Sequence, residues 1–131
     1  MMLYLDNAAT TLKKPLSVYA TLFKSTLFSG GNAGRGGHTM SMDAVRAIVD
    51  TQDLIAQLFN IKKAENIVFT QNATYALNTA ILGTMSNGGH IVVTEMDHNS
   101  VLRPACLPGN YTVVKADKSG YVHAEDVEKA V

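Results

Sequence analysis

Residues 65–83 read ENIVFTQNATYALNTAILG, and the expected fold is derived first from this segment. Residues 67–69 are β-branched or aromatic, residues 70–74 are small or polar, and apolar side chains then recur at helical spacing. The pattern predicts a strand, a tight turn and a helix. At such a junction the unpaired N–H groups of the first helical turn and the positive end of the helix dipole favour a bound anion, often a phosphate. The alternative is an ordinary N-cap formed by Asn72 or Thr74, with no ligand.

Two more strands of the buried type are expected, at residues 91–93 and 111–114. Helices are expected from Pro15 to about residue 23, from an N-cap at Ser41 to about Asn60, over a short piece at 101–103, and from Ala124 onward. This alternation predicts an α/β fold with a mostly parallel βαβ sheet and flanking helices. A polar cluster, residues 94–100, follows the second strand at its carboxyl end, where open α/β sheets bind ligands.

The composition is that of an ordinary globular protein, with 131 residues of which 47% are hydrophobic. Eleven basic residues balance eleven acidic ones without forming a run, so neither nucleic acid nor a membrane surface is predicted as a partner. No apolar run reaches the ~20 residues of a membrane span, and no secretory leader opens the chain, so a cytoplasmic location is expected. The single cysteine, Cys106, cannot form an internal disulfide and is expected to be a small buried residue. The four histidines are scattered, and no metal site is predicted.

Two loops rich in small residues precede the long helix. Residues 6–11 (DNAATT) predict either a turn or a loop whose small side chains let the backbone lie against a ligand. Residues 29–38 hold five glycines but match neither a phosphate loop nor a dinucleotide-binding motif. They predict a flexible connection that presents Arg35 and His38.

Four stretches, taken together and in order, resemble the class V aminotransferases and, within that family, the cysteine desulfurases. The stretches are YLDNAATT (4–11), NAGRGGHTMS (32–41), FTQNATYALN (69–78) and EMDHNSVLRP (95–104). Members of the family use pyridoxal 5′-phosphate (PLP) on the type I transferase fold, so the resemblance implies that cofactor and that fold. It covers essentially the whole chain and implies the N-terminal part of one large PLP-binding domain over residues 1–131, with residues 1–40 as an N-terminal arm and loop.

The resemblance also implies roles at the cofactor. Ala73 and Thr74 would hold the cofactor phosphate through their backbone N–H groups and the Thr74 hydroxyl. His98 would lie over the pyridine ring and move a proton during catalysis, tasks that suit an imidazole. The alternative for His98 is a histidine that only caps a helix or lies in a loop.

Further implied positions lie on the substrate side of the site. Ala8 and Ala9 would form the loop that approaches the substrate closely, and Arg35 and His38 would lie near the mouth of the active site or the dimer partner. A purely structural role is the alternative for Arg35 and His38.

Two positions depart from the family pattern. Asn72 stands where many relatives have glycine, and asparagine is expected to tolerate a positive φ there. Tyr75 stands where many relatives have glutamate, which weakens the choice of a desulfurase over other branches of the family.

The activity implied is conversion of cysteine to alanine with the sulfur held by the enzyme, in a homodimer that can pass sulfur to an acceptor protein. Other class V reactions (an aminotransferase, a selenocysteine lyase or an amino-acid epimerase) and a non-catalytic truncated binding module are the alternatives. The Schiff-base lysine of the family follows a Ser-x-His-type stretch that does not occur in these residues, so the chain alone is expected to be inactive. A partial sheet should also leave apolar helix faces and a strand edge exposed, which predicts self-association.

Overall fold

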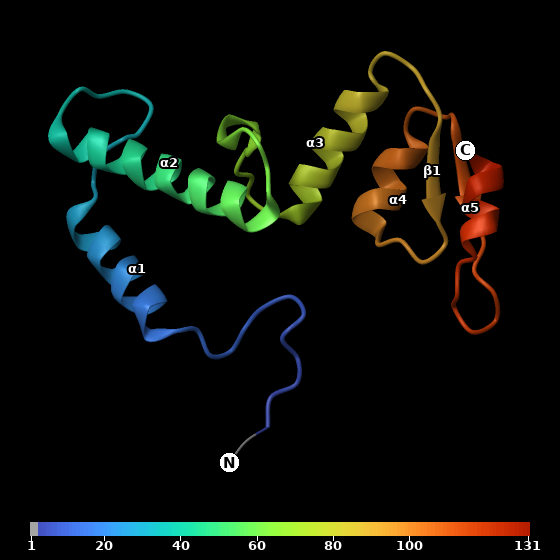
Figure 1. Cartoon of the computed structure of the whole chain (residues 1–131), viewed down its shortest axis with the longest axis horizontal. Helices are drawn as coiled ribbons and strands as arrows, with labels where there is room; N and C mark the ends of the chain where they lie inside the picture. The colour runs from blue at the N-terminus through green and yellow to red at the C-terminus, as the bar shows by residue number, and fades with distance from the viewer. Residues whose placement is uncertain (1–2) are drawn as a thin grey trace. The chain divides into compact units, whose positions relative to one another are not determined.

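The computed structural model describes residues 3–131 (Figure 1). Its elements are α1 (Leu16–Phe28), α2 (Thr39–Phe59), a 3-10 turn η1 (Ala64–Asn66), α3 (Ala73–Met85), β1 (Ile91–Thr94), α4 (Asn99–Cys106), β2 (Tyr111–Val114) and α5 (Ala124–Ala130). The contacts divide the chain into two compact units, Met1–Val68 and Phe69–Val131. The assignment of all 131 residues to one large domain stays a prediction.

The first unit consists of α1, α2 and η1. Helix α2 starts from His38, whose side chain accepts a hydrogen bond from the Ser41 N–H, so the predicted N-cap at Ser41 is wrong. Ser41 instead lies inside the helix and is fully buried. Helix α2 ends at Asn60, which adopts the left-handed conformation (φ 53°) common just after a helix.

The predicted strand at residues 67–69 is wrong, because these residues belong to no strand. Ile67 does have extended dihedral angles (φ −91°, ψ 118°), as its β-branched side chain favours. A strand also needs a hydrogen-bonded neighbour, and within residues 3–131 only β1 and β2 pair with each other. The Ile67 carbonyl is bound by a side chain instead, since the Gln52 amide donates to it over 2.7 Å.

The second unit contains the predicted βαβ arrangement. β1 and β2 are parallel, with Ile91 opposite Tyr111 and Thr94 opposite Val114, and α4 connects them. Helix α4 packs against β1 and α3, and α5 packs against β2 (Figure 1). The core here is small and consists of Val93, Pro104, Ala105 and Val114.

Helix α4 is longer than predicted, since it continues through Pro104 to Cys106. Proline inside a helix loses one backbone hydrogen bond, which normally ends the helix. The Pro104 side chain is among the most completely buried in the chain, so burial of its ring offsets that loss. Cys106, the last residue of this helix, is exposed, so the predicted burial of the cysteine is wrong.

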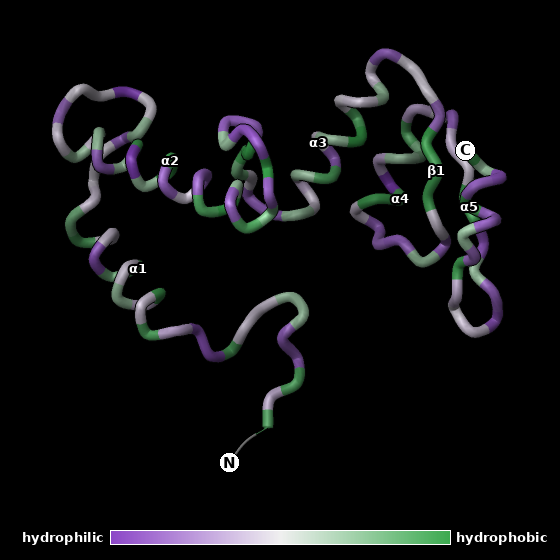
Figure 2. Tube along the Cα trace, viewed as in Figure 1, coloured by the Kyte–Doolittle hydropathy of each residue, from purple (hydrophilic) through white to green (hydrophobic). Residues whose placement is uncertain are grey.

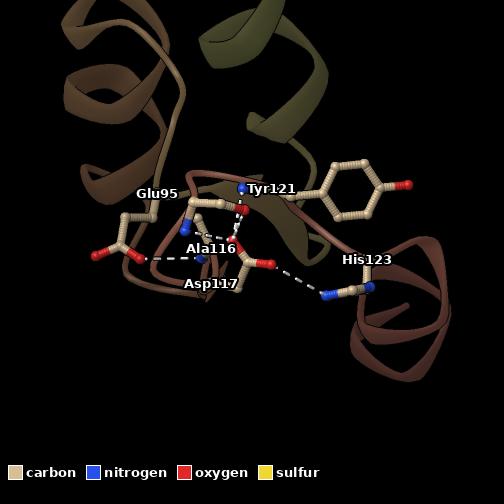
Figure 3. A network of polar contacts seen from close by, with 6 residues as sticks. Glu95, Ala116, Asp117, Tyr121 and His123 are labelled. Carbon is tan, nitrogen blue, oxygen red and sulfur yellow. Dashed lines mark hydrogen bonds and ion pairs between the residues drawn. The ribbon is translucent and has the colours of Figure 1, made fainter.

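A hydrogen-bonded turn joins β2 to α5 (Figure 3). The Asp117 carboxylate accepts hydrogen bonds from the Ser119 hydroxyl (2.6 Å), the Ser119 N–H (2.8 Å) and the Tyr121 N–H (3.0 Å). These bonds, the one from the Ser119 hydroxyl first, lower the pKa of Asp117 from 3.8 to about 2. Glu95, just after β1, accepts from the Ala116 N–H over 3.0 Å, and this bond lowers the pKa of Glu95. Glu95 therefore joins the segment that leaves β1 to the one that leaves β2, whereas Asp117 holds together its own turn.

Much of the apolar surface of the first unit is exposed to solvent. Hydrophobic residues recur along α1 and α2 in Figure 2, but no residue of α1 is buried. Leu16, Phe23 and Phe28 expose 85%, 68% and 68% of their surface. Among residues 3–131, none of the helices is both long and apolar enough to cross a membrane.

Candidate functional site

Asn72 is the N-cap of helix α3, the helix predicted within residues 65–83. Its side-chain oxygen accepts from the Tyr75 N–H over 2.8 Å, and its carbonyl accepts from the Ala76 N–H over 3.1 Å. The alternative that Asn72 caps the helix is therefore confirmed. The Asn72 side chain accepts from only one N–H group, however. The N–H groups of Ala73 and Thr74 have no acceptor anywhere in residues 3–131. Two donors at the positive end of the helix dipole are thus available to an anion.

The backbone of Asn72 also corrects an expectation. Its φ is −166°, which is extended backbone that any residue adopts, so the turn requires no positive φ. The asparagine in place of glycine is useful as the helix cap. Tyr75 exposes 57% of its surface, and nothing in the structure explains a tyrosine at this position.

His98 starts helix α4 immediately after the turn that ends β1. The Asp97 carboxylate forms that turn by accepting from the Thr94 N–H (2.7 Å) and the Thr94 hydroxyl (3.1 Å). The His98 Nδ1 atom accepts from the Ser100 N–H over 3.1 Å and lies 2.9 Å from the Ser100 hydroxyl. A ring nitrogen that accepts an N–H carries no proton, so the neutral ring bears its proton on Nε2. Nε2 has no hydrogen-bond partner within residues 3–131, and this atom remains available to a ligand.

A pocket of about 380 Å³ lies between α3 and α4. It is lined by Thr74, Asn78, His98, Asn99, Ser100 and Arg103. Residues 74 and 78 are one helical turn apart on α3, as are residues 99 and 103 on α4, so each pair lies on one face of its helix. The structure therefore brings Thr74 and His98 to one pocket, whose lining residues all have polar side chains and include no carboxylate.

The substrate-side residues predicted from the sequence belong to the other unit. Ala8 and Ala9 lie in exposed coil, and Arg35 is exposed in the glycine-rich loop. His38 caps α2 through Nδ1, which accepts from the Ser41 N–H over 3.3 Å. The placement of these four residues beside the substrate stays a prediction.

Several residues of the sites were missed by the sequence reasoning. Asn78, Asn99, Ser100 and Arg103 all line the pocket. Residue 78 could have been found from its spacing of four residues from Thr74, and residue 103 from its spacing of four residues from Asn99, the first residue of α4. The burial of Ser41 depends on how the glycine-rich loop folds back, and no local pattern signals it.

The solved structure of a NifS-like protein shares this architecture, with a TM-score of 0.78 over 95% of this chain and 35% of that chain. At 22% identity that likeness establishes the fold. The family model described as "Aminotransferase class-V" matches residues 3–131, so the chain belongs to that family.

Among the relatives of this chain are proteins named probable cysteine desulfurase. A probable cysteine desulfurase of Aeropyrum pernix is 39% identical over 105 residues, which cover 77% of this chain and 25% of the relative. A probable cysteine desulfurase of Halalkalibacterium halodurans is 29% identical over 139 aligned residues, which cover 99% of this chain and 34% of the relative. The chain thus spans about a quarter to a third of the length of these relatives.

Proposed function

We propose that this chain supplies the phosphate-binding part of a PLP-dependent enzyme, and that the enzyme is a cysteine desulfurase that converts cysteine to alanine. The observation that carries the proposal is the single pocket that holds Thr74 and His98 beside two N–H groups without acceptors. Family membership supports the cofactor, and the names of the relatives support cysteine as the substrate. A homodimer, a sulfur-acceptor protein and a cytoplasmic location belong to the same proposal.

The residues present fit the cofactor. A volume of about 380 Å³ lies within the usual range for small-molecule sites, about 300–1,000 Å³. The N–H groups of Ala73 and Thr74 and the Thr74 hydroxyl provide three donors for a phosphate group. No carboxylate lines the pocket to repel such an anion.

When bound, PLP supplies an electron-withdrawing ring that stabilises negative charge on the substrate. The chain's own contribution is binding and proton transfer. Ala73 and Thr74 would hold the phosphate. His98 would then be available at the same pocket to hold or move a proton on its Nε2 atom, while the bond from the Ser100 N–H to Nδ1 keeps the imidazole oriented.

Phosphate binding by this chain can be measured with a probe that cannot react. 4′-Deoxypyridoxine 5′-phosphate lacks the aldehyde of PLP and therefore forms no covalent Schiff base with lysines. In an NMR titration of the ¹⁵N-labelled chain we expect it to shift the amide signals of Ala73 and Thr74, and to bind more tightly than unphosphorylated 4′-deoxypyridoxine. Thr74→Ala should weaken binding of the phosphorylated probe, and not of the unphosphorylated one, by about tenfold or more, because one hydrogen bond to a charged group is lost. Thr84→Ala, which removes a hydroxyl at the far end of α3, is the matched control.

Equal affinity for the two probes would refute the phosphate site. In the full-length protein, the absence of a new visible absorbance band after addition of PLP would refute the cofactor.

The role of His98 is tested in the full-length protein by following alanine production from cysteine, and the sulfide released when dithiothreitol is present to reduce the enzyme-bound sulfur. His98→Phe keeps an aromatic ring but has no titratable nitrogen, so it should retain PLP and lose turnover. His98→Ala should lose both. Full activity of His98→Phe would show that His98 does not transfer a proton during catalysis. Production of a keto acid in place of alanine would assign the enzyme to another class V reaction.

A further inference from the structure

Arg103 is a cation without a partner at the pocket. It lines the pocket together with Thr74, and its guanidinium makes no ion pair or hydrogen bond to any of residues 3–131. Three other cations of the described chain, Arg46, Lys115 and Lys129, each pair with a carboxylate. Five N–H donors of Arg103 are therefore free to bind a ligand.

The position of Arg103 is set by the packing of α4. Pro104 and Ala105, the next two residues, are fully buried, so the helix cannot rotate without exposing them. With that face held in the core, Asn99 and Arg103 lie one turn apart on the face that lines the pocket with α3. The arginine is thus presented to the pocket by a fixed helix.

A positively charged group such as the Arg103 guanidinium would balance the charge of a phosphate monoester. At neutral pH the phosphate carries about −1.5 to −2 charges, while the N-terminus of α3 offers the equivalent of about +0.5. Arg103 is the one lining residue with a permanent positive charge. Its planar guanidinium can also bind two phosphate oxygens at once, which a lysine cannot do.

We propose that Arg103 is a second ligand of the cofactor phosphate, which it binds from α4 while Ala73 and Thr74 bind it from α3. This inference rests on the proposed function, because it presumes that the phosphorylated cofactor occupies the pocket. It adds a permanent charge to a site that the sequence resemblance describes only by Ala73, Thr74 and His98.

The test is the same non-covalent titration, made with the full chain and four variants: Arg103→Gln, Arg103→Lys, Thr74→Ala and Lys118→Gln. Arg103→Gln should weaken binding of 4′-deoxypyridoxine 5′-phosphate by about tenfold or more, since it removes a charge-assisted pair of hydrogen bonds. Binding of the unphosphorylated probe should be unchanged. Arg103→Lys should show a smaller loss, because charge is kept and the paired hydrogen bonds are not. Lys118→Gln removes an exposed positive charge away from the pocket and should have no effect, which controls for net charge.

The outcomes separate this inference from the proposed function. If the wild-type chain does not prefer the phosphorylated probe, the proposed function fails. If it does, and Thr74→Ala weakens binding but Arg103→Gln does not, only the assignment of Arg103 is overturned. A rise confined to the KM for cysteine in the full-length Arg103→Gln enzyme, with unchanged affinity for the phosphorylated probe, would assign Arg103 to the substrate carboxylate and would also overturn it.

Discussion

Replacing Ser41 by alanine should loosen the glycine-rich loop of residues 30–38. The Ser41 hydroxyl is fully buried and lies 2.7 Å from the Asn32 carbonyl oxygen and 2.8 Å from the Gly36 carbonyl oxygen, so one proton serves two acceptors. The loop is packed closely around this hydroxyl, since a Cβ added at Gly36 would lie 2.8 Å from the Ser41 Oγ. Alanine keeps the helix but leaves both carbonyls without this donor.

The expected magnitude follows from the hydrogen bonds lost. Leaving a buried acceptor unpaired costs about 1–3 kcal/mol. Because these carbonyls are only partly buried, the loop should lose about 1–2 kcal/mol, which corresponds to a factor of about 5 to 30 in the opening equilibrium. Arg35 lies in this loop, so the same change should make its position less defined.

Native-state hydrogen exchange measures the opening directly. The Gly34 N–H donates to the Asn32 side chain over 2.8 Å and reports on the closed loop. In Ser41→Ala its exchange should be about 5- to 30-fold faster than in the wild-type chain. Ser17→Ala, an exposed serine on α1, should leave it unchanged. Exchange of Gly34 within twofold of the wild-type rate in Ser41→Ala would refute the role assigned to the Ser41 hydroxyl.

Three further perturbations have defined outcomes. Asn72→Ala removes the cap of α3 and should destabilise that helix by about 1 kcal/mol, which is measured as faster hydrogen exchange of the Tyr75 amide. Asn72→Asp keeps a capping oxygen and is the control. Equal losses of stability in both variants would contradict the role of Asn72 as the cap. The pKa of Asp117 is lowered to about 2, so its contribution to stability is present above the ordinary value of 3.8 and is lost as the pH falls through about 2. The amide signals of Ser119 and Tyr121 should therefore titrate near pH 2, and a midpoint at the ordinary value would disprove the lowered pKa. The exposed apolar surface of α1 should make the chain self-associate and bind a hydrophobic dye; a monodisperse monomer in sedimentation that binds no dye would contradict this.

The sequence determined the local features of this protein. Asn72 caps α3 because a short polar side chain before an apolar helical pattern can bind the first turn, and both partners lie within three residues. β1 and β2 are short apolar runs bounded by turn residues, and the helix between them requires them to be parallel. The positions of Ala73, Thr74 and His98 at two helix starts likewise follow from local patterns.

The tertiary structure decided what depends on segments far apart in the chain. Residues 67–69 have the side chains of a strand and remain unpaired within residues 3–131, because a strand exists only with a neighbour. Ser41 is buried because a loop nine residues earlier folds over it. Cys106 is exposed although its side chain is apolar, because the buried face of α4 is taken by Pro104 and Ala105. Arg103 lines the pocket of Thr74 because α4 packs against α3, and the packing of two helices cannot be derived from the pattern of either one alone.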